Sequence, residues 1–479
     1  MKMIIGGVAV NASDGSEIDV INPALHKVID KVPSASNKDV DKAIENAVLG
    51  FKEWSAVPLF DRINIIYKYA DILEERLEEL AMLQCRESGK AITLCRGEAA
   101  AAMNVFRAYA EKARNFGGEV MPIDSEKRIQ DDLIVVIREP LGIVGCIVPF
   151  NYPMELYAHK VAPALVTGNS VIIKPASDTP LANILMTQWL LEAGVPGNAV
   201  QIITGSGPEV GKCLAENPKV NLITFTGSTA VGIQLMAGCS NDLRHCHLEL
   251  GGNCPLIVFD DCDLDKAVEE TIGGRASNAG QTCCANKRMI VQNSIKAKYT
   301  EKLLEELKKV KVGNPEDDNT TYGSMINESA AQRVIEQINK TVGQGAKCIC
   351  GGKIFDRTFI EPTVLTDVKP DMDIAKDMEV FGPVFPIIGF DTLEEAVAIA
   401  NGTIFGLSGA VMTGDMKKAF SVAKSLQCGT VVVNASGNYR SMHQAFGGHK
   451  MSGHGTEGIT YTLEEFTQKK TIALKAVFG

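Results

Sequence analysis

Two short segments of the chain combine glycines with a side chain that can carry out covalent or acid–base chemistry. Residues 280–285 read Gly-Gln-Thr-Cys-Cys-Ala, and residues 249–252 read Glu-Leu-Gly-Gly. A cysteine thiolate attacks a carbonyl carbon, and a carboxylate takes a proton from water. Each residue also has a structural interpretation, because a free cysteine is usually buried and a glutamate often pairs with a surface cation. Cys283 and Glu249 are therefore candidates for a nucleophile and a general base.

Two further segments have residue types that can hold a phosphate or a ribose. Residues 225–232, Phe-Thr-Gly-Ser-Thr-Ala-Val-Gly, follow a predicted strand and open a predicted helix, where backbone N–H groups can approach a phosphate. The spacing differs from the usual G-x-G-x-x-G, and a plain strand–turn–helix corner explains it equally well. Lys174, in the Lys-Pro-Ala-Ser segment 174–177, follows another predicted strand. It either reaches the ligand or is a solvated strand end.

The elements that would position these segments alternate between apolar strands and helices. Helices are predicted at residues 153–166 and 181–193. Apolar strands separated by helices indicate a parallel sheet covered on both faces, and right-handed crossovers make it doubly wound. Ligands bind at the carboxyl ends of the strands in such sheets. The predicted strands of this block are 143–148, 170–174, 200–204, 221–225 and 247–250.

A helix-rich region precedes this block, and a second alternating block follows it. Helices are predicted at residues 37–54, 61–87 and 98–116, followed by a β segment at 133–138. The second block begins at residue 255 and extends to about residue 447. No low-complexity linker separates the two blocks, so they are expected to pack closely. The strands predicted in the second block are 255–259, 288–291, 348–350, 363–365, 384–390 and 430–434.

The composition fits a globular protein of two or three domains. The chain has 479 residues, too many for one compact core, and its net charge of −10 argues against nucleic acid as a partner. No segment approaches the roughly 20 continuous apolar residues of a membrane span. Residues 1–13 only faintly resemble a signal peptide. The 13 scattered cysteines predict free thiols and a cytoplasmic location.

Seven motifs occur in order over nearly the whole chain. They are Pro-Phe-Asn-Tyr-Pro at 149–153, Lys-Pro-Ala-Ser at 174–177, Phe-Thr-Gly-Ser at 225–228, Glu-Leu-Gly-Gly at 249–252, Gly-Gln-x-Cys at 280–283, Glu-Val-Phe-Gly-Pro at 379–383 and Phe-Gly-Gly-His-Lys-x-Ser-Gly at 446–453. Together they resemble the motifs of the aldehyde dehydrogenase superfamily. The resemblance implies a Rossmann-like doubly wound cofactor domain, an α/β catalytic domain and a small β oligomerisation flap.

The resemblance implies how the chemistry is divided among the residues. Cys283 attacks the aldehyde, and Asn151 with the backbone N–H of Cys283 forms an oxyanion hole. Hydride loss to NAD or NADP leaves a thioester, which Glu249 helps water to hydrolyse. The residues implied in cofactor binding are Pro149, Phe150, Lys174, Ser177, Gly207, Gly227, Ser228, Gly232, Leu250, Glu379 and Phe381.

Position 177 departs from the pattern of relatives that strongly prefer NAD. Those relatives often have a glutamate there, which bonds the ribose hydroxyls. Ser177 removes that carboxylate and leaves room for a 2′-phosphate, with which Lys174 can pair. We therefore predict that NADP is used.

The substrate is implied only by class. The stretch around Arg440 resembles the branch that oxidises lactaldehyde, succinate semialdehyde, phosphonoacetaldehyde and glyceraldehyde 3-phosphate, which are small polar or anionic aldehydes. Some phosphate-using relatives have an arginine at position 282, so Thr282 disfavours glyceraldehyde 3-phosphate. Arg440 and Arg107 could equally make surface ion pairs. The candidate substrate residues are Arg107, Tyr152, Thr282, Cys284, Arg440 and His443, of which Cys284 is more simply interpreted as a packed neighbour of the nucleophile.

The resemblance also divides the chain into regions. Residues 1–120 and 140–251 are assigned to the NAD(P)-binding domain and 252–447 to the catalytic domain. Residues 121–139 and 448–479 are assigned to oligomerisation, with residues 470–478 adding a strand to a partner's sheet in a homodimer or homotetramer.

Two alternative functions remain open at this point. A CoA-acylating relative typically lacks the catalytic glutamate, so Glu249 argues against that activity. A catalytically silent member of the family would not require Asn151, Glu249 and Cys283 together. His245 and His247 lie on one strand face without a third ligand nearby in the sequence, so no metal site is expected.

Overall fold

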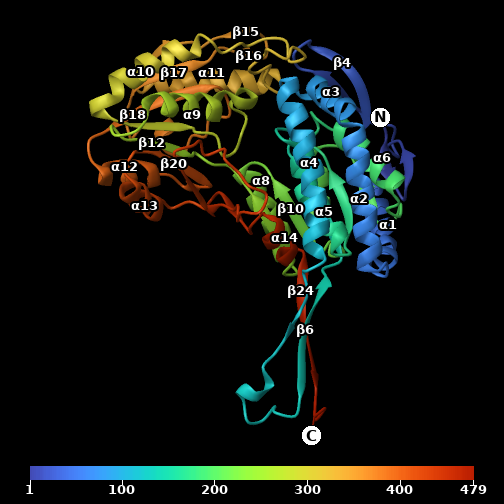
Figure 1. Ribbon diagram of the computed structural model, residues 1–479. Coiled ribbons are helices and arrows are strands. Elements are labelled where there is room, and N and C mark those ends of the chain that lie inside the picture. Colours follow the sequence, from blue (N-terminus) through green and yellow to red (C-terminus); the bar gives the residue numbers. More distant parts are fainter. Residues whose placement is uncertain (479) are drawn as a thin grey trace.

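The structure is a computed structural model that describes residues 1–478. Figure 1 shows two α/β bodies side by side and a narrow β arm that projects away from them. The first body is built on an eight-stranded sheet and the second on a seven-stranded sheet. This arrangement confirms the predicted α/β class.

The eight-stranded sheet has the order β2-β1-β9-β8-β7-β10-β11-β23. The five strands from β9 to β11 in this order are parallel to one another. Strand β1 pairs antiparallel with β9 at one end of this group, and β23 pairs antiparallel with β11 at the other. The strands are β1 (Met3–Ile5), β2 (Val8–Val10), β7 (Ile143–Ile147), β8 (Ser170–Lys174), β9 (Val200–Ile202), β10 (Leu222–Thr226), β11 (His245–Glu249) and β23 (Gly453–His454).

Helices cover both faces of this sheet, so the doubly wound prediction is confirmed. One face packs on α2, α4, α5 and α6 through a large apolar cluster, and the other packs on α1, α7 and α8. The strands β7, β8 and β10 are buried along their whole length, which explains their continuous apolar sequences. The helices are α1 (Asn37–Ser55), α2 (Leu59–Glu75), α3 (Leu77–Ser88), α4 (Ile92–Ala113), α5 (Pro153–Val166), α6 (Leu181–Ala193), α7 (Gly207–Glu216), α8 (Thr229–Ser240) and α14 (Ile459–Glu465).

One helix predicted in the N-terminal region was wrong. The range 61–87 was predicted as one helix, but it is interrupted at Arg76, whose φ of −112° and ψ of 22° are not helical. The apolar periodicity continues across this break, so it does not reveal it. The first 33 residues, which precede the first predicted helix, form strands, including the hairpin of β3 (Glu17–Asn22) and β4 (Lys27–Pro33).

The seven-stranded sheet has the order β14-β17-β18-β13-β12-β20-β21 and is parallel except for β14. Its strands are β12 (Pro255–Val258), β13 (Arg288–Gln292), β14 (Lys347–Cys350), β17 (Thr363–Val368), β18 (Val384–Phe390), β20 (Ser408–Met412) and β21 (Thr430–Val433). Its helices are α9 (Leu264–Ala276), α10 (Asn293–Leu307), α11 (Glu328–Gly343), α12 (Leu393–Asn401) and α13 (Met416–Ser425). The remaining short elements are β15 (Ile354–Asp356), β16 (Phe359–Ile360), β19 (Phe405–Gly406), β22 (His449–Lys450) and the 3₁₀ turns η1 (Ile123–Ser125), η2 (Ser277–Gly280) and η3 (Asp373–Ala375).

The β arm in Figure 1 consists of β24 (Thr467–Leu474), β6 (Leu133–Pro140) and β5 (Glu119–Val120), in that order. Strand β24 pairs with β6 of its own chain along its whole length, rather than being left unpaired until a partner arrives. Its other edge has no strand beside it in the described chain. Within the segment 448–479, β23 pairs with β11 and α14 packs on α4 and α5, so only β24 contributes to the arm. Among residues 1–478, no helix has the length and apolar character needed to cross a membrane.

Candidate active site

A strained turn holds Cys283 at the point where the two bodies meet. Asn278, Ala279 and Gly280 at the end of η2 have φ angles of 50°, 53° and 73°. Positive φ is uncommon outside glycine and tends to occur at functional sites. A Cβ atom at Gly280 would lie 2.3 Å from the carbonyl oxygen of Gly382, so this position requires glycine for space as well as conformation. The turn directs residues 281–284 towards the first sheet.

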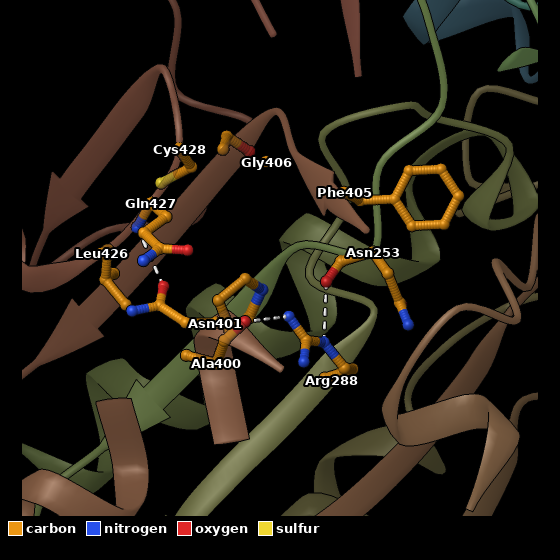
Figure 2. A pocket seen from close by; sticks show the side chains of 11 residues that line it. Asn253, Arg288, Ala400, Asn401, Phe405, Gly406, Leu426, Gln427 and Cys428 are labelled. Atoms are coloured by element: carbon orange, nitrogen blue, oxygen red, sulfur yellow. Dashed lines mark hydrogen bonds between the residues drawn. The ribbon is translucent and has the colours of Figure 1, made fainter. Parts of the chain in front are cut away.

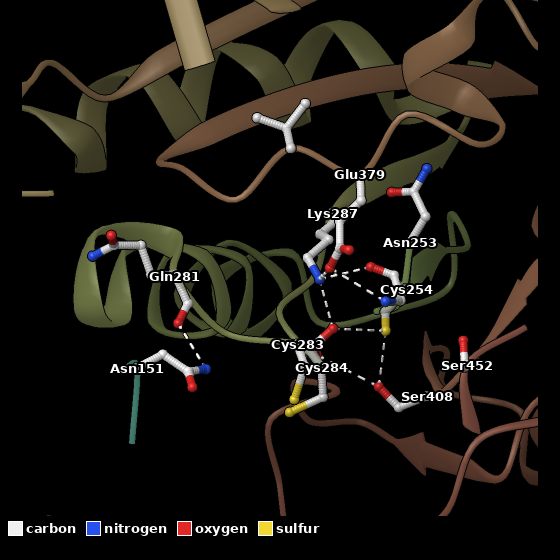
Figure 3. Close-up of polar contacts among 12 residues, drawn as sticks. Asn151, Asn253, Cys254, Gln281, Cys283, Cys284, Lys287, Glu379, Ser408 and Ser452 are labelled. Carbon is white, nitrogen blue, oxygen red and sulfur yellow. Dashed lines mark hydrogen bonds and ion pairs between the residues drawn. The ribbon is translucent and has the colours of Figure 1, made fainter. Parts of the chain in front are cut away.

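Asn151 joins this loop from the other body. It lies four residues after β7, and its Nδ2 donates to the carbonyl oxygen of Gln281 at 3.2 Å. The Asn278 amide donates in turn to the carbonyl oxygen of Asn151 at 3.0 Å. Asn151 is 5% exposed. Figure 3 shows its amide facing Gln281, with the Cys283 and Cys284 sulfurs beside one another. The predicted oxyanion donor is thus fixed to the nucleophile loop.

Glu249 ends β11 and is buried. Neither of its carboxylate oxygens has a hydrogen-bond partner within residues 1–478. Burial, followed by the charge of Glu457, raises the pKa of Glu249 well above the ordinary range, and Cys283 is close enough to contribute. An unpaired buried carboxyl group of raised pKa is a good proton acceptor once it is ionised.

The Cys283 thiol is held mainly in its neutral form. Contact with the Cys284 thiol and burial raise the pKa of Cys283, whereas the cations Lys287 and Arg440 lower it. A proton acceptor is therefore needed to generate the thiolate. Cys284 is buried against Cys254, Leu407 and Phe446, as expected for a packed neighbour.

A cleft of about 580 Å³ extends from the first sheet to Cys283. Strands β7, β8 and β10 end at this cleft, in agreement with the rule for ligands in such sheets. Of the predicted cofactor residues, Gly232 does not line the cleft. It lies in the first turn of α8 and packs against the Leu250 side chain. The predicted residues that line it are Pro149, Phe150, Asn151, Lys174, Ser177, Gly207, Gly227, Ser228, Leu250, Cys283, Glu379 and Phe381.

The cleft has the groups needed to hold a dinucleotide. Ser228 caps α8 by accepting from the Val231 N–H, so the start of a 12-residue helix faces the cleft at Gly227 and Ser228. Lys174 and Arg333 add positive charge, and burial lowers the pKa of Lys174 to about 8.

The groups beside Cys283 suit the nicotinamide end of the cofactor. Glu379 Oε1 accepts from Lys287 and from the Gly252 N–H, while a Cβ at Gly251 would lie 2.4 Å from Glu379 Oε2. The rings of Phe150 and Phe381 meet edge to face at 6.0 Å.

Comparisons with known proteins agree with this geometry. Residues 10–472 match the model of the aldehyde dehydrogenase family. The chain is 39% identical over 473 residues to the mitochondrial succinate-semialdehyde dehydrogenase of Arabidopsis thaliana, covering 98% of this chain and 88% of the relative. It is 35% identical to the NADP(+) succinate-semialdehyde dehydrogenase of Escherichia coli, covering 99% and 97%. The chain belongs to the aldehyde dehydrogenase family.

The fold comparison supports the same assignment. Betaine aldehyde dehydrogenase from Staphylococcus aureus, solved in complex with NAD+, superimposes with a TM-score of 0.96 at 35% identity, covering 99% of this chain and 95% of that one. As an aldehyde dehydrogenase of the semialdehyde branch, this protein is an NAD(P)-dependent oxidoreductase that oxidises small aldehydes.

The two arginines suggested as substrate contacts have different environments in this aldehyde dehydrogenase. Arg107 on α4 is bound to Asp71 at 2.8 Å and Glu74 at 2.6 Å, both exposed on α2, so it belongs to a surface ion-pair cluster. The structure does not bring Arg107 to the cleft. Its assignment as a substrate residue is therefore corrected.

Arg440 lies at the site and forms an ion pair with the buried Glu457. Its charge acts on Cys283 and Glu249, and its Nε is buried without a partner in the described chain. Burial lowers the pKa of the neighbouring His159 to about 3, so that imidazole is neutral and Arg440 and Lys160 supply the positive charge near Glu457. Arg440 thus remains a candidate substrate contact.

Of the other predicted substrate residues, Tyr152 and Thr282 lie beside the nucleophile, whereas the His443 side chain is exposed. The Tyr152 hydroxyl lies 3.5 Å from the Thr282 hydroxyl, directly before the nucleophile. His443 is exposed, and its backbone N–H, not its imidazole, donates to the Ser441 hydroxyl at 3.3 Å. Within residues 1–478, no group of three His, Cys, Asp or Glu side chains is placed to hold a metal ion.

Three functional candidates were missed by the sequence analysis, namely Lys287, Arg333 and Glu457. Arg333 is on the polar side of the amphipathic helix α11, which is typical of a solvated face. Lys287 follows the nucleophile by four residues and directly precedes the buried strand β13, and a lysine beside an apolar strand is a sequence signal for a buried, paired cation.

A second cavity, in the body built on the seven-stranded sheet, is too small to be a ligand site. Figure 2 shows Arg288 in its wall, and its volume is about 10 Å³. That is close to the minimum for one water molecule. The Arg288 guanidinium donates to the carbonyl oxygens of Asn253 and Ala400, at 2.7 Å in each case, so it joins β13 to two neighbouring segments.

Proposed function

We propose that this enzyme oxidises a small polar or anionic aldehyde to the free acid through a thioester on Cys283. The observation that carries the proposal is that Cys283 and Asn151 line the inner end of a cleft suited to a dinucleotide, with the buried Glu249 behind it and close enough for Cys283 to affect its pKa. Each of the three residues comes from a different strand or loop, and no packing role requires all of them at one place.

The first step is attack by the Cys283 sulfur on the aldehyde carbon. The thiol must first lose its proton to water, and the nearby cations Lys287 and Arg440 favour the thiolate that forms. The Asn151 amide, held beside Gln281, and the Cys283 backbone N–H then stabilise the negative oxygen of the tetrahedral adduct.

NAD or NADP, when bound, supplies the acceptor for the hydride that leaves the tetrahedral carbon. Lys174, Ser177, the start of α8, Glu379 and Phe381 are the groups that would hold it. Glu249 then takes a proton from water so that the water can attack the thioester, and the Cys283 sulfur leaves.

Release of a free acid distinguishes this activity from transfer of the acyl group to CoA. We expect aldehyde-dependent reduction of the nucleotide, with the free acid as product, in buffer that contains no CoA. Turnover that required CoA, with an acyl-CoA as product, would contradict the proposed role of Glu249. The panel should include propanal, lactaldehyde and succinate semialdehyde, each with NAD and with NADP.

The pocket around Ser177 predicts use of NADP. The Ser177 hydroxyl donates to the Gly205 carbonyl oxygen at 3.0 Å, and the Lys174 ammonium lies in the same cleft with no carboxylate at position 177 to oppose a 2′-phosphate. Ser177→Glu should shift the ratio of kcat/KM from NADP towards NAD by at least about tenfold, because the new carboxylate repels the phosphate.

The pH dependence provides a second measurement of this pocket. Because burial lowers the pKa of Lys174 to about 8, its positive charge is lost as the pH rises through that value. The preference for NADP in the wild type should therefore decline above about pH 8, while kcat/KM for NAD changes less. A wild type that rejects NADP at every pH would contradict the assignment.

The substrate proposal rests on Arg440. Its unpaired Nε and its proximity to Cys283 favour an aldehyde with a hydrogen-bond acceptor or a carboxylate, such as lactaldehyde or succinate semialdehyde. Arg440→Met should lower kcat/KM for succinate semialdehyde relative to propanal by about tenfold or more. It should also destabilise the fold by about 3–5 kcal/mol, because Glu457 keeps a buried charge without its partner.

Arg107→Met is the matched control for this experiment. Its ion pairs are exposed and are worth little, so stability should change by less than about 1 kcal/mol and the substrate ratio should stay constant. If the substrate ratio changes in the Arg107 variant and not in the Arg440 variant, the assignment of the two arginines is wrong. Thermal unfolding and steady-state kinetics on both variants give the answer.

Assembly and location are proposed on separate grounds. The open edge of β24 in the β arm supports association into a homodimer or homotetramer, because an unpaired edge strand can pair with another chain. The particle mass in sedimentation measures this directly. Each of the 13 cysteines is free in the described structure, which favours a reducing compartment such as the cytoplasm.

A further inference from the structure

One buried lysine contacts both halves of the active site. The Lys287 ammonium is fully buried and donates to Glu379 Oε1 at 2.5 Å, the Cys283 carbonyl oxygen at 2.6 Å and the Gly252 carbonyl oxygen at 2.6 Å. Figure 3 shows these bonds converging on its Nζ. The three donors of an ammonium group are thereby all used.

The partners of Lys287 come from three separate segments. Cys283 belongs to the nucleophile loop, Gly252 to the loop that follows Glu249, and Glu379 to the loop before β18. Gly252 also approaches closely, because a Cβ there would lie 3.1 Å from the Cys283 carbonyl oxygen. The ammonium therefore fixes the spacing of the loops that bear the nucleophile, the general base and a cofactor ligand.

The contact with Glu379 has a directional consequence. Lys287 and the Gly252 N–H both bond to Oε1, and the Lys287 ammonium also lies 5.4 Å from the centre of the Phe381 ring. Oε2 is therefore left for a ligand in the cleft, while the carboxylate is held in one orientation. A preorganised acceptor loses less freedom when the ligand binds.

The same ammonium is one of the charges around the Cys283 sulfur. The titratable groups that face this thiol are the thiols of Cys284 and Cys254, the carboxyl group of Glu249, and the cations Lys287 and Arg440. Lys287 is thus a cation shared between the nucleophile and Glu379, whose carboxylate partly balances its charge.

We propose that Lys287 is a positioning residue that couples the cofactor cleft to the nucleophile, by orienting Glu379 and by placing a partly balanced positive charge beside Cys283. This inference rests on the proposed function, in which Glu379 contacts the cofactor and Cys283 attacks the aldehyde. It assigns Lys287 an effect on both, which a lysine that only cross-links loops would not have.

The test uses the full-length protein and two measurements that do not depend on turnover. The first is the dissociation constant of NADPH, measured by fluorescence titration. The second is the pH midpoint for alkylation of Cys283 by iodoacetamide in the absence of nucleotide, with the modified peptide identified by mass spectrometry.

Lys287→Met and Glu379→Gln should give opposite shifts in the alkylation midpoint. Without the ammonium, the midpoint should rise by about one pH unit, because a nearby opposite charge stabilises the thiolate. Without the carboxylate, Lys287 is no longer balanced, and the midpoint should fall. Both variants should bind NADPH about tenfold more weakly, because each removes or releases the oriented acceptor.

Two further variants complete the experiment. Lys287→Arg retains the charge and should restore the midpoint. Lys309→Met removes an exposed lysine that pairs with Glu306 and should change neither measurement. If Lys287→Met does not fold, Glu379→Gln still decides, because it must lower the midpoint.

The inference would be overturned if Lys287→Met lost thermal stability but kept the alkylation midpoint and the NADPH dissociation constant of the wild type. An unchanged or raised midpoint in Glu379→Gln would do the same. Failure of the proposed function gives different results. If Glu379 does not bind the cofactor, Glu379→Gln keeps the NADPH affinity while the midpoint still falls. If Cys283 is not the nucleophile, Cys283→Ala stays active whatever the midpoints are.

Discussion

Cys283→Ala should reduce aldehyde oxidation by roughly 10⁴–10⁶-fold, as removal of a covalent nucleophile does in comparable enzymes. Oxidation of an aldehyde requires a tetrahedral carbon that carries a hydride to lose, and the sulfur provides it by addition. Cys283 is only partly buried and lies at the margin of the small apolar cluster of Cys254, Cys284, Leu407 and Phe446, so alanine removes little packing. The variant should therefore keep the fold of the wild type, which circular dichroism and thermal unfolding verify.

Cys284→Ala is the matched control, since the two thiols are adjacent. Cys284 packs against Cys254, Leu407 and Phe446, so its truncation removes a small buried volume and no chemistry. Most of the activity should remain, with a modest loss of stability. Because the Cys284 thiol raises the pKa of Cys283, the variant should also alkylate Cys283 more readily at a given pH. If the activities of the two variants are reversed, the nucleophile is Cys284.

The second large effect is expected from Glu249→Gln. The amide cannot take a proton from water, so steady-state turnover should fall by about 10²–10⁴-fold, the usual contribution of a general base. That corresponds to roughly 3–5 kcal/mol of barrier at 1.36 kcal/mol per tenfold. Because Glu249 is buried without a hydrogen-bond partner in the described chain, the isosteric amide should not weaken a bond that the fold requires.

The pH profile should change with the same substitution. Burial and Glu457 raise the pKa of Glu249, so its basic form appears only as the pH rises through that raised value. In the wild type, kcat should therefore increase with pH on the acidic side of the profile. Glu249→Gln should lose this dependence together with the rate. If kcat of the mutant still increased with pH on the acidic side of the profile, a group other than Glu249 would be responsible for that increase.

Much of the framework was predictable because buried parallel strands and amphipathic helices have simple patterns. The predicted bounds of β8, α5, α6 and β18 match the structure. These elements lie between clear turn residues, and their apolar residues face neighbours on both sides of the sheet or on one side of a helix. The break at Arg76 was missed because both helices bury the same face, so the periodicity continues across it.

A site residue could be predicted where its role follows from its own chemical type. It could not be predicted where its role depends on its neighbours in the folded protein. Cys283, Asn151 and Glu249 stand in recognisable segments. Arg107 and Arg440 look equivalent in the sequence, but one pairs with exposed acids and the other with the buried Glu457. Their roles differ because of charges contributed by segments far away in the chain.

Lys287 was missed for a related reason. Its function depends on two backbone carbonyl groups and on Glu379, which is 92 residues further along the chain. Backbone carbonyl groups carry no sequence signal, so the convergence of three loops on one ammonium becomes visible only in three dimensions.

The measurement that most directly tests the thioester mechanism is rapid mixing of Glu249→Gln with aldehyde and nucleotide, followed by mass spectrometry. We expect one burst of reduced nucleotide per active site and then a stall, with the acyl mass on the peptide that contains Cys283. Full steady-state turnover, or an acyl group on another residue, would contradict the account. A missing burst would also contradict the hydrolytic role, because it would show that Glu249 is required before hydride transfer.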